Sequence, residues 1–498
     1  MTTETLSPSG GRRALPLLPT AVLLALLALW LLFRAQPLLA AALAVAVVAV
    51  ALAWLRPFWL FAGVMAFVPL YDGLLRVVTW QWRWPDQYIR LLSLWKEGAI
   101  LLLFVALAVL HLSGRRRLTW RLYQFDLWLV AVVALAAAYI PVATRLGIGV
   151  YGLRNYLVPL ALFFLARLLA PSRRELTVAL ALWTLVAAGV AAFGIYQARF
   201  IDFPTMVRMG YVDENGALPF AFKTALRDGM PIPRAISTAT GPNQLALYLN
   251  FFILLCLMAF VRWRSPLRRA LLAGLLALFT ACLLLTFSRG GFLALMVSLA
   301  AWVGIWVKER GVRRTLAELL GNRLALVGLI GAAALLVWGL VASGFVTRVV
   351  RGLTGRDPAA DAHVSSMAYS LGFLTQHPMG IGMGMVGERA LKFSGEAPIQ
   401  HTESTYFQFG METGVFGMVL LLLALTSLML TLWRMRGRAQ ADGRLWALFL
   451  AELAIVYWAG ALVDFVVTPL LQNLLAAGHL WTIAGLAFAQ DASRRATS

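Results

Sequence analysis

GVFGMVLLLLALTSLMLTLW, residues 414–433, is an apolar run without a charged side chain. An α-helix rises ~1.5 Å per residue, so a run of this length crosses the hydrocarbon core of a bilayer, which is about 30 Å thick. The rest of the chain has the same character, because 61% of its 498 residues are hydrophobic and only 13% are charged. Helices also satisfy their own backbone hydrogen bonds in lipid. The sequence therefore predicts an all-α integral membrane protein.

Similar apolar runs recur along the chain and predict a polytopic bundle of about 12–14 transmembrane helices. The candidate segments are 15–33, 38–55, 57–75, 97–113, 125–143, 152–170, 175–196, 240–262, 270–287, 291–307, 324–343, 414–433, 445–467 and 471–489. The first follows two arginines but has no small-residue cleavage site behind it. We interpret it as a retained helix rather than a signal peptide.

The formal net charge of +21 indicates how the chain lies in the membrane. A basic patch on a soluble surface would indicate nucleic-acid binding, but here the arginines flank apolar runs. Basic residues in short links favour the cytoplasmic side. If the helices alternate in direction, the basic links, including 115–121, 262–269 and 434–444, all fall on one side. We expect a multi-pass protein in contact with membrane lipids and not with nucleic acid, with both termini cytoplasmic.

The same alternation places three longer segments on the extracytoplasmic side: 76–96, 197–239 and 344–413. The second and third are too long for hairpin turns, and they are rich in Gly, Pro, Asp and Arg. Loops of this length in a compact protein are usually functional. We therefore expect two long extracytoplasmic loops, 197–239 and 344–413, to carry the chemistry.

Three arginines are predicted at the outer ends of helices. Arg154 is expected at the start of a helix, Arg234 just before another, and Arg289 in a link of about four residues, SRGG, between two helices. Each arginine alone could extend to lipid headgroups. Together they favour an anion site, because the planar guanidinium makes two parallel hydrogen bonds to a phosphate group.

Five short stretches together resemble the O-antigen ligase and polymerase superfamily of lipid-linked oligosaccharide transferases. They are LRNYL at 153–157, TATGPNQLALYL at 238–249, TFSRGGFLA at 286–294, HPMGIGMG at 377–384 and HTESTYFQFGMETGVFGM at 401–418. The resemblance implies an enzyme of the bacterial cytoplasmic (inner) membrane. It would move a glycan from a polyprenyl-diphosphate donor to an acceptor hydroxyl, with its active site on the extracytoplasmic face.

The resemblance also suggests how the chain is organised. Residues 1–143 would form N-terminal transmembrane helices, and residues 144–433 a ligase- or polymerase-like catalytic core that includes both long loops. Residues 434–498 would add the last transmembrane helices and a cytoplasmic tail. Arg154, Arg234 and Arg289 would bind the diphosphate of the donor.

The register of the stretch at 401–418 distinguishes the branches of this family. Ligase-like members place a histidine before Asn, Ser or Gln, followed after nine free positions by Gly and, after two more, by Gly, Thr or Tyr. Counting back from Gly414 and Gly417 places Glu403 and Ser404 at those positions, with His401 two residues earlier. This departure favours a polymerase-like member. Glu403 is the expected general base, and His401 is the alternative base or its hydrogen-bond partner.

The resemblance assigns supporting roles to other motif residues. Asn243, Ser288 and Tyr406 lie within the shared stretches, together with Ser404, Gly414 and Gly417. Glu412 is expected at the N-terminus of the helix that follows, where the helix dipole favours a carboxylate. Lys96 and Glu97, at the outer end of the fourth helix, are expected to find separate partners.

Metal and cofactor sites are not expected. A metal site would have to combine His401 with His363, His377 and Glu388, but their spacing is not that of a zinc site. The sequence also has no Walker or dinucleotide signature. We expect a metal-independent, inverting transferase without a cofactor.

Several alternatives stay open at this point. Within the family, the acceptor could be lipid A core, as for an O-antigen ligase of lipopolysaccharide, or a protein hydroxyl. From another class, a secondary transporter would account for Glu452, Asp464 and His479 within the last two spans, because ionisable groups inside a membrane are often functional. A scaffold that binds a lipid-linked sugar without turning it over is a third possibility.

Overall fold

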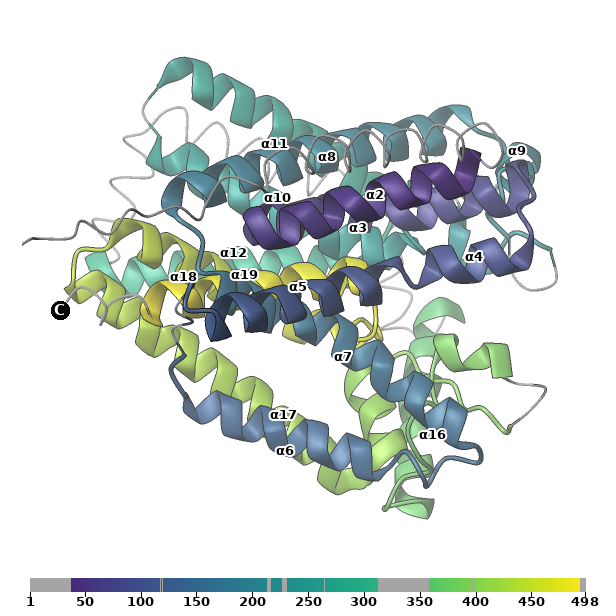
Figure 1. Ribbon diagram of the computed structural model, residues 1–498. Coiled ribbons are helices and arrows are strands. Elements are labelled where there is room, and N and C mark those ends of the chain that lie inside the picture. The colour runs from purple at the N-terminus through teal and green to yellow at the C-terminus, as the bar shows by residue number, and fades with distance from the viewer. Residues whose placement is uncertain are drawn as a thin grey trace, which may run out of the picture.

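The computed structural model describes residues 37–492 apart from 117, 119, 213–215, 226–230, 264, 312–357, 394 and 396. This part of the chain is almost entirely helical (Figure 1). Nine of the described helices are long and apolar enough to cross a membrane, and two shorter apolar helices accompany them. The chain is therefore an all-α polytopic membrane protein, as predicted.

The α-helices are α2 (Pro37–Leu55), α3 (Pro57–Arg76), α4 (Asp86–Ser93), α5 (Trp95–Leu112), α6 (Gln124–Ala138), α7 (Leu146–Leu169), α8 (Arg173–Phe200), α9 (Phe203–Arg208), α10 (Pro242–Arg262), α11 (Pro266–Thr286), α12 (Arg289–Arg310), α16 (Pro358–Gln376), α17 (Thr405–Ala441), α18 (Leu445–Asp464) and α19 (Leu474–Ala492). Shorter elements are η1 (Val77–Gln81), η2 (Phe220–Phe222) and η3 (Glu388–Phe393). Two strands, β1 (Lys223–Ala225) and β2 (Pro231–Pro233), pair antiparallel with Thr224 opposite Ile232.

Twelve of the predicted spans coincide with described helices, while 15–33 and 324–343 lie outside the described residues. The largest difference concerns α17, which has a first part from Thr405 to a break at Gly414, before the predicted span. Its first turns are polar, so a search for apolar runs does not find them. The Thr405 hydroxyl donates to the carbonyl of Thr468 (2.8 Å), and that of Tyr406 to the carbonyl of Leu462 (2.7 Å). These tertiary hydrogen bonds extend the helix beyond its apolar part.

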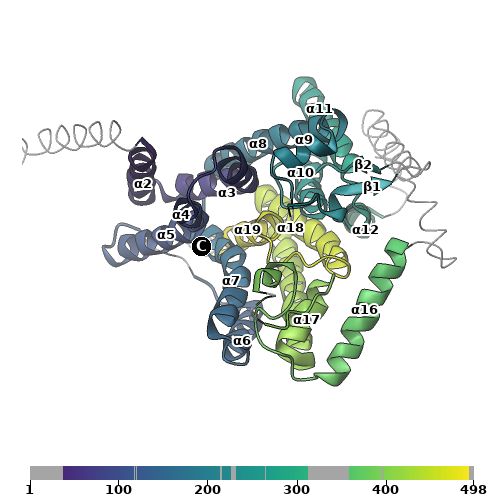
Figure 2. The same cartoon turned by 90° about the vertical axis from the view of Figure 1, so that its right-hand side faces the viewer.

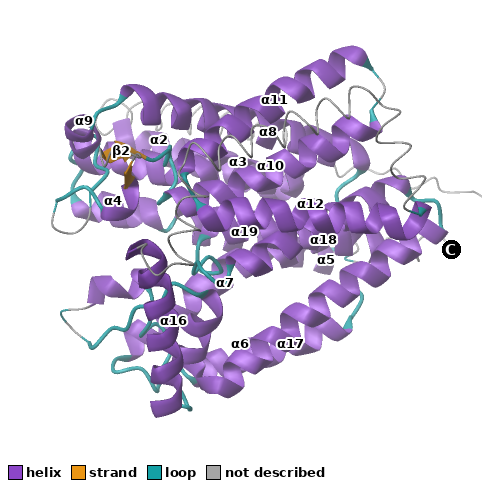
Figure 3. Cartoon of the chain, turned by 180° about the vertical axis from the view of Figure 1, so that it is seen from behind, coloured by secondary structure: helices purple, strands orange, loops and turns teal. Residues whose placement is uncertain are grey.

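The long loops meet at one end of the bundle. Figure 1 shows α4, α9 and α16 at one end and the C-terminus at the other, and Figure 3 shows β2 beside α9. Successive long helices alternate in direction, so the links 139–145, 201–241, 377–404 and 465–473 share this end. We call it the loop-bearing end. The opposite end, which carries the basic links, is called the basic end.

Helix α19 lies at the centre of the bundle (Figure 2) and packs against α7, α10, α17 and α18. Its close contact with α7 depends on small residues. A Cβ atom added at Gly485 would meet the carbonyl oxygen of Phe163, and one at Gly478 would lie 3.1 Å from a methyl group of Leu162. Without a strong hydrophobic force between helices in lipid, such close backbone packing stabilises the bundle.

Buried ion pairs hold the helices together at the basic end. Arg167, which is 1% exposed, binds Asp126 on α6 through two nitrogens at 2.7 and 3.1 Å. Glu452 on α18 accepts hydrogen bonds from Arg436 (3.2 Å) and from Arg262. Removing one partner of such a pair leaves an uncompensated charge in a low-dielectric environment. These charges therefore connect helices to one another.

Candidate active site at the loop-bearing end

Helix α17 is interrupted at Gly414, and a glycine-rich loop fills the interruption. Gly414 has φ 80° and ψ 174°, a conformation that essentially only glycine adopts. The break frees backbone carbonyls one turn earlier. The N–H of Ile381 donates to the carbonyl of Met411 and that of Gly382 to the carbonyl of Glu412, both at 3.0 Å. The loop 377–387 is thereby fixed to α17 at the break, near the start of the helix.

The same loop also packs against the first turns of α7. Gly384 has φ 76°, and a Cβ atom there would meet the carbonyl oxygen of Ile148 and lie 3.1 Å from the backbone of Gly152. The N–H of Met383 donates to the carbonyl of Tyr139 at 3.2 Å. The motif HPMGIGMG therefore brings three backbone segments into direct contact.

Glu412 lies two residues before the break at Gly414, close to the start of the second part of α17 as expected, but its carboxylate binds groups outside α17. The Glu412 side chain is fully buried, at the end of the first part of α17. Its carboxylate accepts a hydrogen bond from the N–H of Gly384 (3.0 Å) and another from the Tyr156 hydroxyl (3.0 Å). A buried carboxylate needs such donors to offset its desolvation. Glu412 thus connects α7, α17 and the glycine-rich loop.

Replacing Glu412 by Ala is expected to loosen the loop, because the N–H of Gly384 and the hydroxyl of Tyr156 lose their shared acceptor. Each buried group left without a partner costs about 1–3 kcal/mol. Glu412→Gln keeps an acceptor oxygen for Gly384 and serves as the matched control. We expect the Ala variant to unfold at a clearly lower temperature than the Gln variant, measured on purified protein in detergent. Equal unfolding temperatures for the two variants would contradict this role.

The segment that carries the predicted base is anchored at alternate residues. Thr402 is buried, and its hydroxyl lies 2.8 Å from that of Ser370 on α16. The Ser404 hydroxyl donates to a backbone carbonyl in the link between α18 and α19 (3.1 Å). Glu403 lies between these anchors and is half-buried, with its backbone N–H 3.4 Å from a serine hydroxyl on α16, whereas His401 precedes Thr402 and is exposed. The segment therefore holds its two titratable side chains in a defined register.

Arg289 begins α12, and the link before it contains two residues rather than about four. Ser288 is the N-cap, and its side chain accepts a hydrogen bond from the N–H of Gly291 at 3.2 Å. A Cβ atom at Gly290 would meet the Asp464 carboxylate and lie 3.2 Å from Val467. The start of α12 therefore lies against the same α18–α19 link that Ser404 contacts. The segments of Arg289 and Glu403 border one structural element.

The Arg234 side chain makes hydrogen bonds within the protein. Its guanidinium donates to the carbonyl oxygens of Thr286 (2.7 Å) and Ala221 (2.9 Å) and to the side-chain oxygen of Asn243 (3.3 Å). The acceptors come from the end of α11, from the loop 201–241 and from the first turn of α10. Arg234 and Asn243 therefore hold this loop to the bundle.

The loop 201–241 has a small core of its own, which includes Met206, Tyr211, Phe222 and Ile236. The Tyr211 hydroxyl donates to the carbonyl of Ser237 (2.7 Å), and the Arg76 guanidinium lies 4.3 Å from the Tyr211 ring centroid. Burial raises the pKa of the Tyr211 phenol, and the neighbouring Arg76 opposes that rise. Tyr211 therefore stays protonated and acts as a donor near neutral pH.

Arg154 lies two turns inside α7 rather than at the start of the helix. It forms an ion pair with Glu97 on α5, and its guanidinium lies 5.7 Å from the Tyr151 ring centroid. Lys96 and Glu97 do not find separate partners as expected, since the Lys96 ammonium is 3.5 Å from the Glu97 carboxylate. Arg154 thus belongs to a group on α5 and α7, whereas Arg234 and Arg289 belong to α10–α12.

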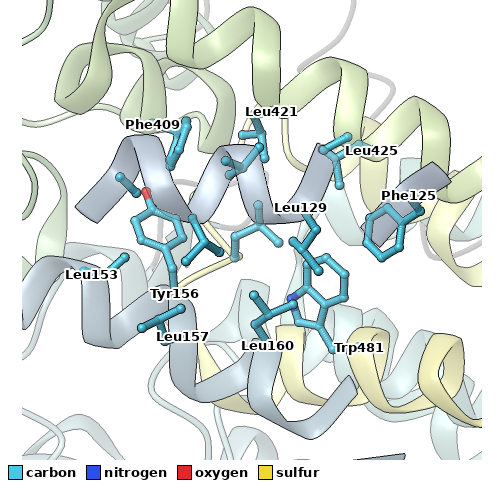
Figure 4. A pocket seen from close by; sticks show the side chains of 15 residues that line it. Phe125, Leu129, Leu153, Tyr156, Leu157, Leu160, Phe409, Leu421, Leu425 and Trp481 are labelled. Carbon is cyan, nitrogen blue, oxygen red and sulfur yellow. The ribbon is translucent and has the colours of Figure 1, made fainter. Parts of the chain in front are cut away.

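An apolar cavity lies between α6, α7, α17 and α19 (Figure 4). Its volume is about 50 Å³, and leucine, valine and aromatic side chains form nearly all of its wall. Leu129, Leu160, Leu425 and Trp481 line one part of it, and Phe409 and Tyr156 lie toward the other. Tyr156 is also the residue that donates to Glu412. Such a wall suits a hydrocarbon chain and offers almost no hydrogen bonds to a sugar.

Gly414 and Gly417, the two glycines from which the position of the expected base was counted, are both buried in α17. A Cβ atom at Gly417 would meet the Thr413 side chain and lie 3.3 Å from a methyl group of Leu135 on α6. In the part of the chain that the structure describes, no group of three His, Cys, Asp or Glu side chains is placed to hold a metal ion.

Comparison with known proteins adds one finding. Residues 273–422 match a family model described as O-Antigen ligase. The matched segment includes the start of α12, helix α16, the glycine-rich loop, the base-bearing segment and the first half of α17. No curated protein matches the chain.

Proposed function

We propose that this chain, which belongs to the O-antigen ligase and polymerase superfamily, polymerises the repeat units of a bacterial surface polysaccharide. Members of this family act as glycosyltransferases on lipid-linked glycans. In our proposal the donor is a glycan on a polyprenyl diphosphate, and the acceptor is a hydroxyl of another lipid-linked repeat unit. Joining the glycan to lipid A core is the second candidate.

One observation carries the proposal: the segments of Glu403 and Arg289 border the same α18–α19 link. The N–H of Thr405 donates to the carbonyl of Phe465 (2.9 Å), and Gly290 at the start of α12 lies against Asp464. A glycan transfer needs a proton acceptor and a cation at the two ends of one displacement. The loop-bearing end supplies both within one region.

The proposed reaction is a single displacement. The oxygen of the acceptor hydroxyl attacks the anomeric carbon, and its proton passes to the Glu403 carboxylate. The bond between the anomeric carbon and the diphosphate oxygen breaks, and its electron pair stays on the diphosphate. Arg289 stabilises the negative charge that develops there. A direct displacement inverts the anomeric centre and needs no metal ion for charge balance.

The register of residues 401–418 against the ligase-like pattern favours a polymerase over a ligase. Glu403 stands where the ligase-like pattern has its histidine, and the exposed His401 is two residues away. His401 is therefore proposed as a neighbour of the acceptor rather than as the base. Arg234 is proposed to support the site indirectly, because its guanidinium binds three protein oxygens.

The ionisable groups that suggested a transporter have partners within the bundle. Glu452 pairs with two arginines near the basic end. Asp464 accepts a hydrogen bond from the Thr468 hydroxyl (3.1 Å), and His479 lies between the rings of Tyr248 and Phe251, with Nδ1 3.0 Å from a backbone carbonyl. Glu452 therefore has a structural role that favours the enzyme, whereas among the described residues Asp464 Oδ2 and His479 Nε2 make no hydrogen bond.

Orientation follows from the distribution of charge. Arginine-rich links gather at the basic end, so we place that end in the cytoplasm and the loop-bearing end outside the inner membrane. The apolar cavity between α6, α7, α17 and α19 then provides space for hydrocarbon below the site. A lipid donor would enter sideways from the outer leaflet.

A transfer assay with purified protein in detergent tests the proposal. The substrate is a labelled polyprenyl-diphosphate-linked repeat unit, with and without added lipid A core. A polymerase yields labelled chains of several units still attached to the carrier. A ligase yields product only when lipid A core is added. Absence of any covalent product under both conditions, combined with uptake in sealed vesicles, would support a transporter instead.

A further inference from the structure

A second group of cations gathers around α3, α5 and α7 at the loop-bearing end, apart from Arg234 and Arg289. Four basic side chains form this group, which we call the basic cluster: Lys96, Arg154, Arg389 and Lys392. Lys96 and Arg154 come from α5 and α7, while Arg389 and Lys392 come from η3. The long loop 377–404 therefore contributes half of the cluster.

Contacts to shared neighbours show that the four cations lie together. Lys96 and Arg154 both bind Glu97. Arg389 interacts electrostatically with Asp72 and with Lys96. The Lys392 ammonium lies 3.3 Å from the Tyr151 ring centroid, and Arg154 approaches the same ring. Glu97 and Tyr151 thus connect the helical and loop halves of the cluster.

The cluster carries more positive than negative charge. Its four cations face two carboxylates, Asp72 and Glu97, and Arg76 on α3 adds a fifth cation beside Asp72. Lys96 and Arg154 are partly withdrawn from solvent, with exposed fractions of 15% and 31%, and Arg389 is half-buried, whereas Lys392 is exposed. Uncompensated charge in such surroundings is unfavourable. An anion bound here would offset it.

The surface below the cluster indicates a lipid as the source of that anion. Leu101, Val105 and Val109 of α5 are 64%, 48% and 42% exposed, and they follow Glu97 at four-residue spacing. Residues four apart lie on one helix face, so Glu97 stands at the top of an apolar stripe that faces the bilayer. A lipid chain lying along this stripe would place its head group at the cluster.

We propose that the basic cluster binds the diphosphate head group of a prenyl lipid. The inference rests on the proposed function, which makes such lipids the substrates. The guanidinium groups of Arg154 and Arg389 suit the phosphate oxygens, and Lys96 and Lys392 add point charges. Binding shifts Arg154 from Glu97 to the phosphate. Sequence reasoning identified only Arg154, because the other three cations belong to none of the motifs that resemble the family.

The helices that contribute to this cluster lie apart from the helix that Arg289 begins. Figure 2 shows α5 and α7 on one side of the central helix α19, and α12 and α16 on the other. Binding to the basic cluster should therefore survive the loss of Arg289. The binding assay therefore uses a chain with Arg289→Ala, so that a head group held by Arg289 does not contribute to the signal.

The test measures binding of radiolabelled farnesyl diphosphate to the full chain in nanodiscs of neutral phosphatidylcholine. All variants carry Arg289→Ala, and the chain with this substitution alone is the background. The cluster variant carries Arg389→Ala and Lys392→Ala in addition. The matched control adds Arg173→Ala with Arg174→Ala, two exposed cations at the basic end. A charge-assisted hydrogen bond to phosphate is worth about a factor of ten or more in affinity. We expect the cluster variant to bind at least about tenfold more weakly than both the background and the control.

Three results would overturn the inference. Arg289→Ala alone could abolish binding, the cluster variant could bind as tightly as its background, or phosphatidylglycerol could displace the probe at equal concentration. The last result would indicate a site for bulk anionic lipid. Thermal unfolding of each variant checks that it is folded. The transfer assay is independent: activity of the wild-type chain with unchanged binding by the cluster variant would overturn only this inference, whereas a wild type that transfers no glycan would overturn the proposed function.

Discussion

Glu403→Gln is expected to lower glycan transfer by about 10²–10⁴-fold, the range in which a general base contributes to catalysis. Glutamine keeps the size of the side chain and leaves the backbone contact of residue 403 with α16 in place. It cannot accept the proton of the acceptor hydroxyl. The loss should therefore appear in the chemical step and not in folding, which thermal unfolding of the purified variant verifies.

His401→Ala is the matched comparison, because His401 is exposed and lies two residues from Glu403 in the same segment. The measurement is the length distribution of surface polysaccharide in a deletion strain that carries each variant. We expect single repeat units with Glu403→Gln and nearly normal chains with His401→Ala. Normal chains with Glu403→Gln and single units with His401→Ala would exchange the two roles and favour a ligase-like mechanism.

The apolar runs predict the spans well, because membrane helices are selected by length and hydrophobicity, which are local properties of the sequence. Helix ends are set differently. Helix α17 begins in the polar residues from Thr405, held by hydrogen bonds to the α18–α19 link, and α7 begins before the apolar run that ends at Leu169. Both extensions depend on segments distant in the sequence. A local pattern therefore fixes the middle of each helix and not its ends.

The candidate site likewise has features that the local sequence predicts and features that depend on long-range contacts. Sequence alone indicates that arginines, a histidine and a glutamate gather at the loop-bearing end, and the order of the helices places their segments there. It does not reveal that Glu412 binds Gly384 and Tyr156, since those residues are separated from it by 28 and 256 positions. Nor does it reveal Arg389 and Lys392, which approach α7 only because the glycine-rich loop packs on that helix. Long-range packing of this kind has no local signature.

Arg289→Ala is expected to reduce the rate of transfer by about 10²–10³-fold at saturating donor, the cost of losing one group that stabilises developing charge. The negative charge on the leaving diphosphate is largest in the transition state, so the effect should fall on kcat more than on KM. Arg289→Lys keeps the charge but loses the planar fork and should recover only part of the rate. The measurement is steady-state transfer by purified protein with the donor concentration varied.

Arg234→Ala separates a catalytic role from a structural one. The Arg234 guanidinium donates to Thr286, Ala221 and Asn243, so its loss should free the loop 201–241 and lower the unfolding temperature. Arg289→Ala should lower that temperature less, because the helix start is also held by the hydrogen bond from the N–H of Gly291 to the Ser288 side chain. If Arg234→Ala instead slowed transfer at unchanged stability while Arg289→Ala lowered stability alone, the diphosphate would have to be assigned to Arg234. The start of α10, rather than that of α12, would then face the leaving group.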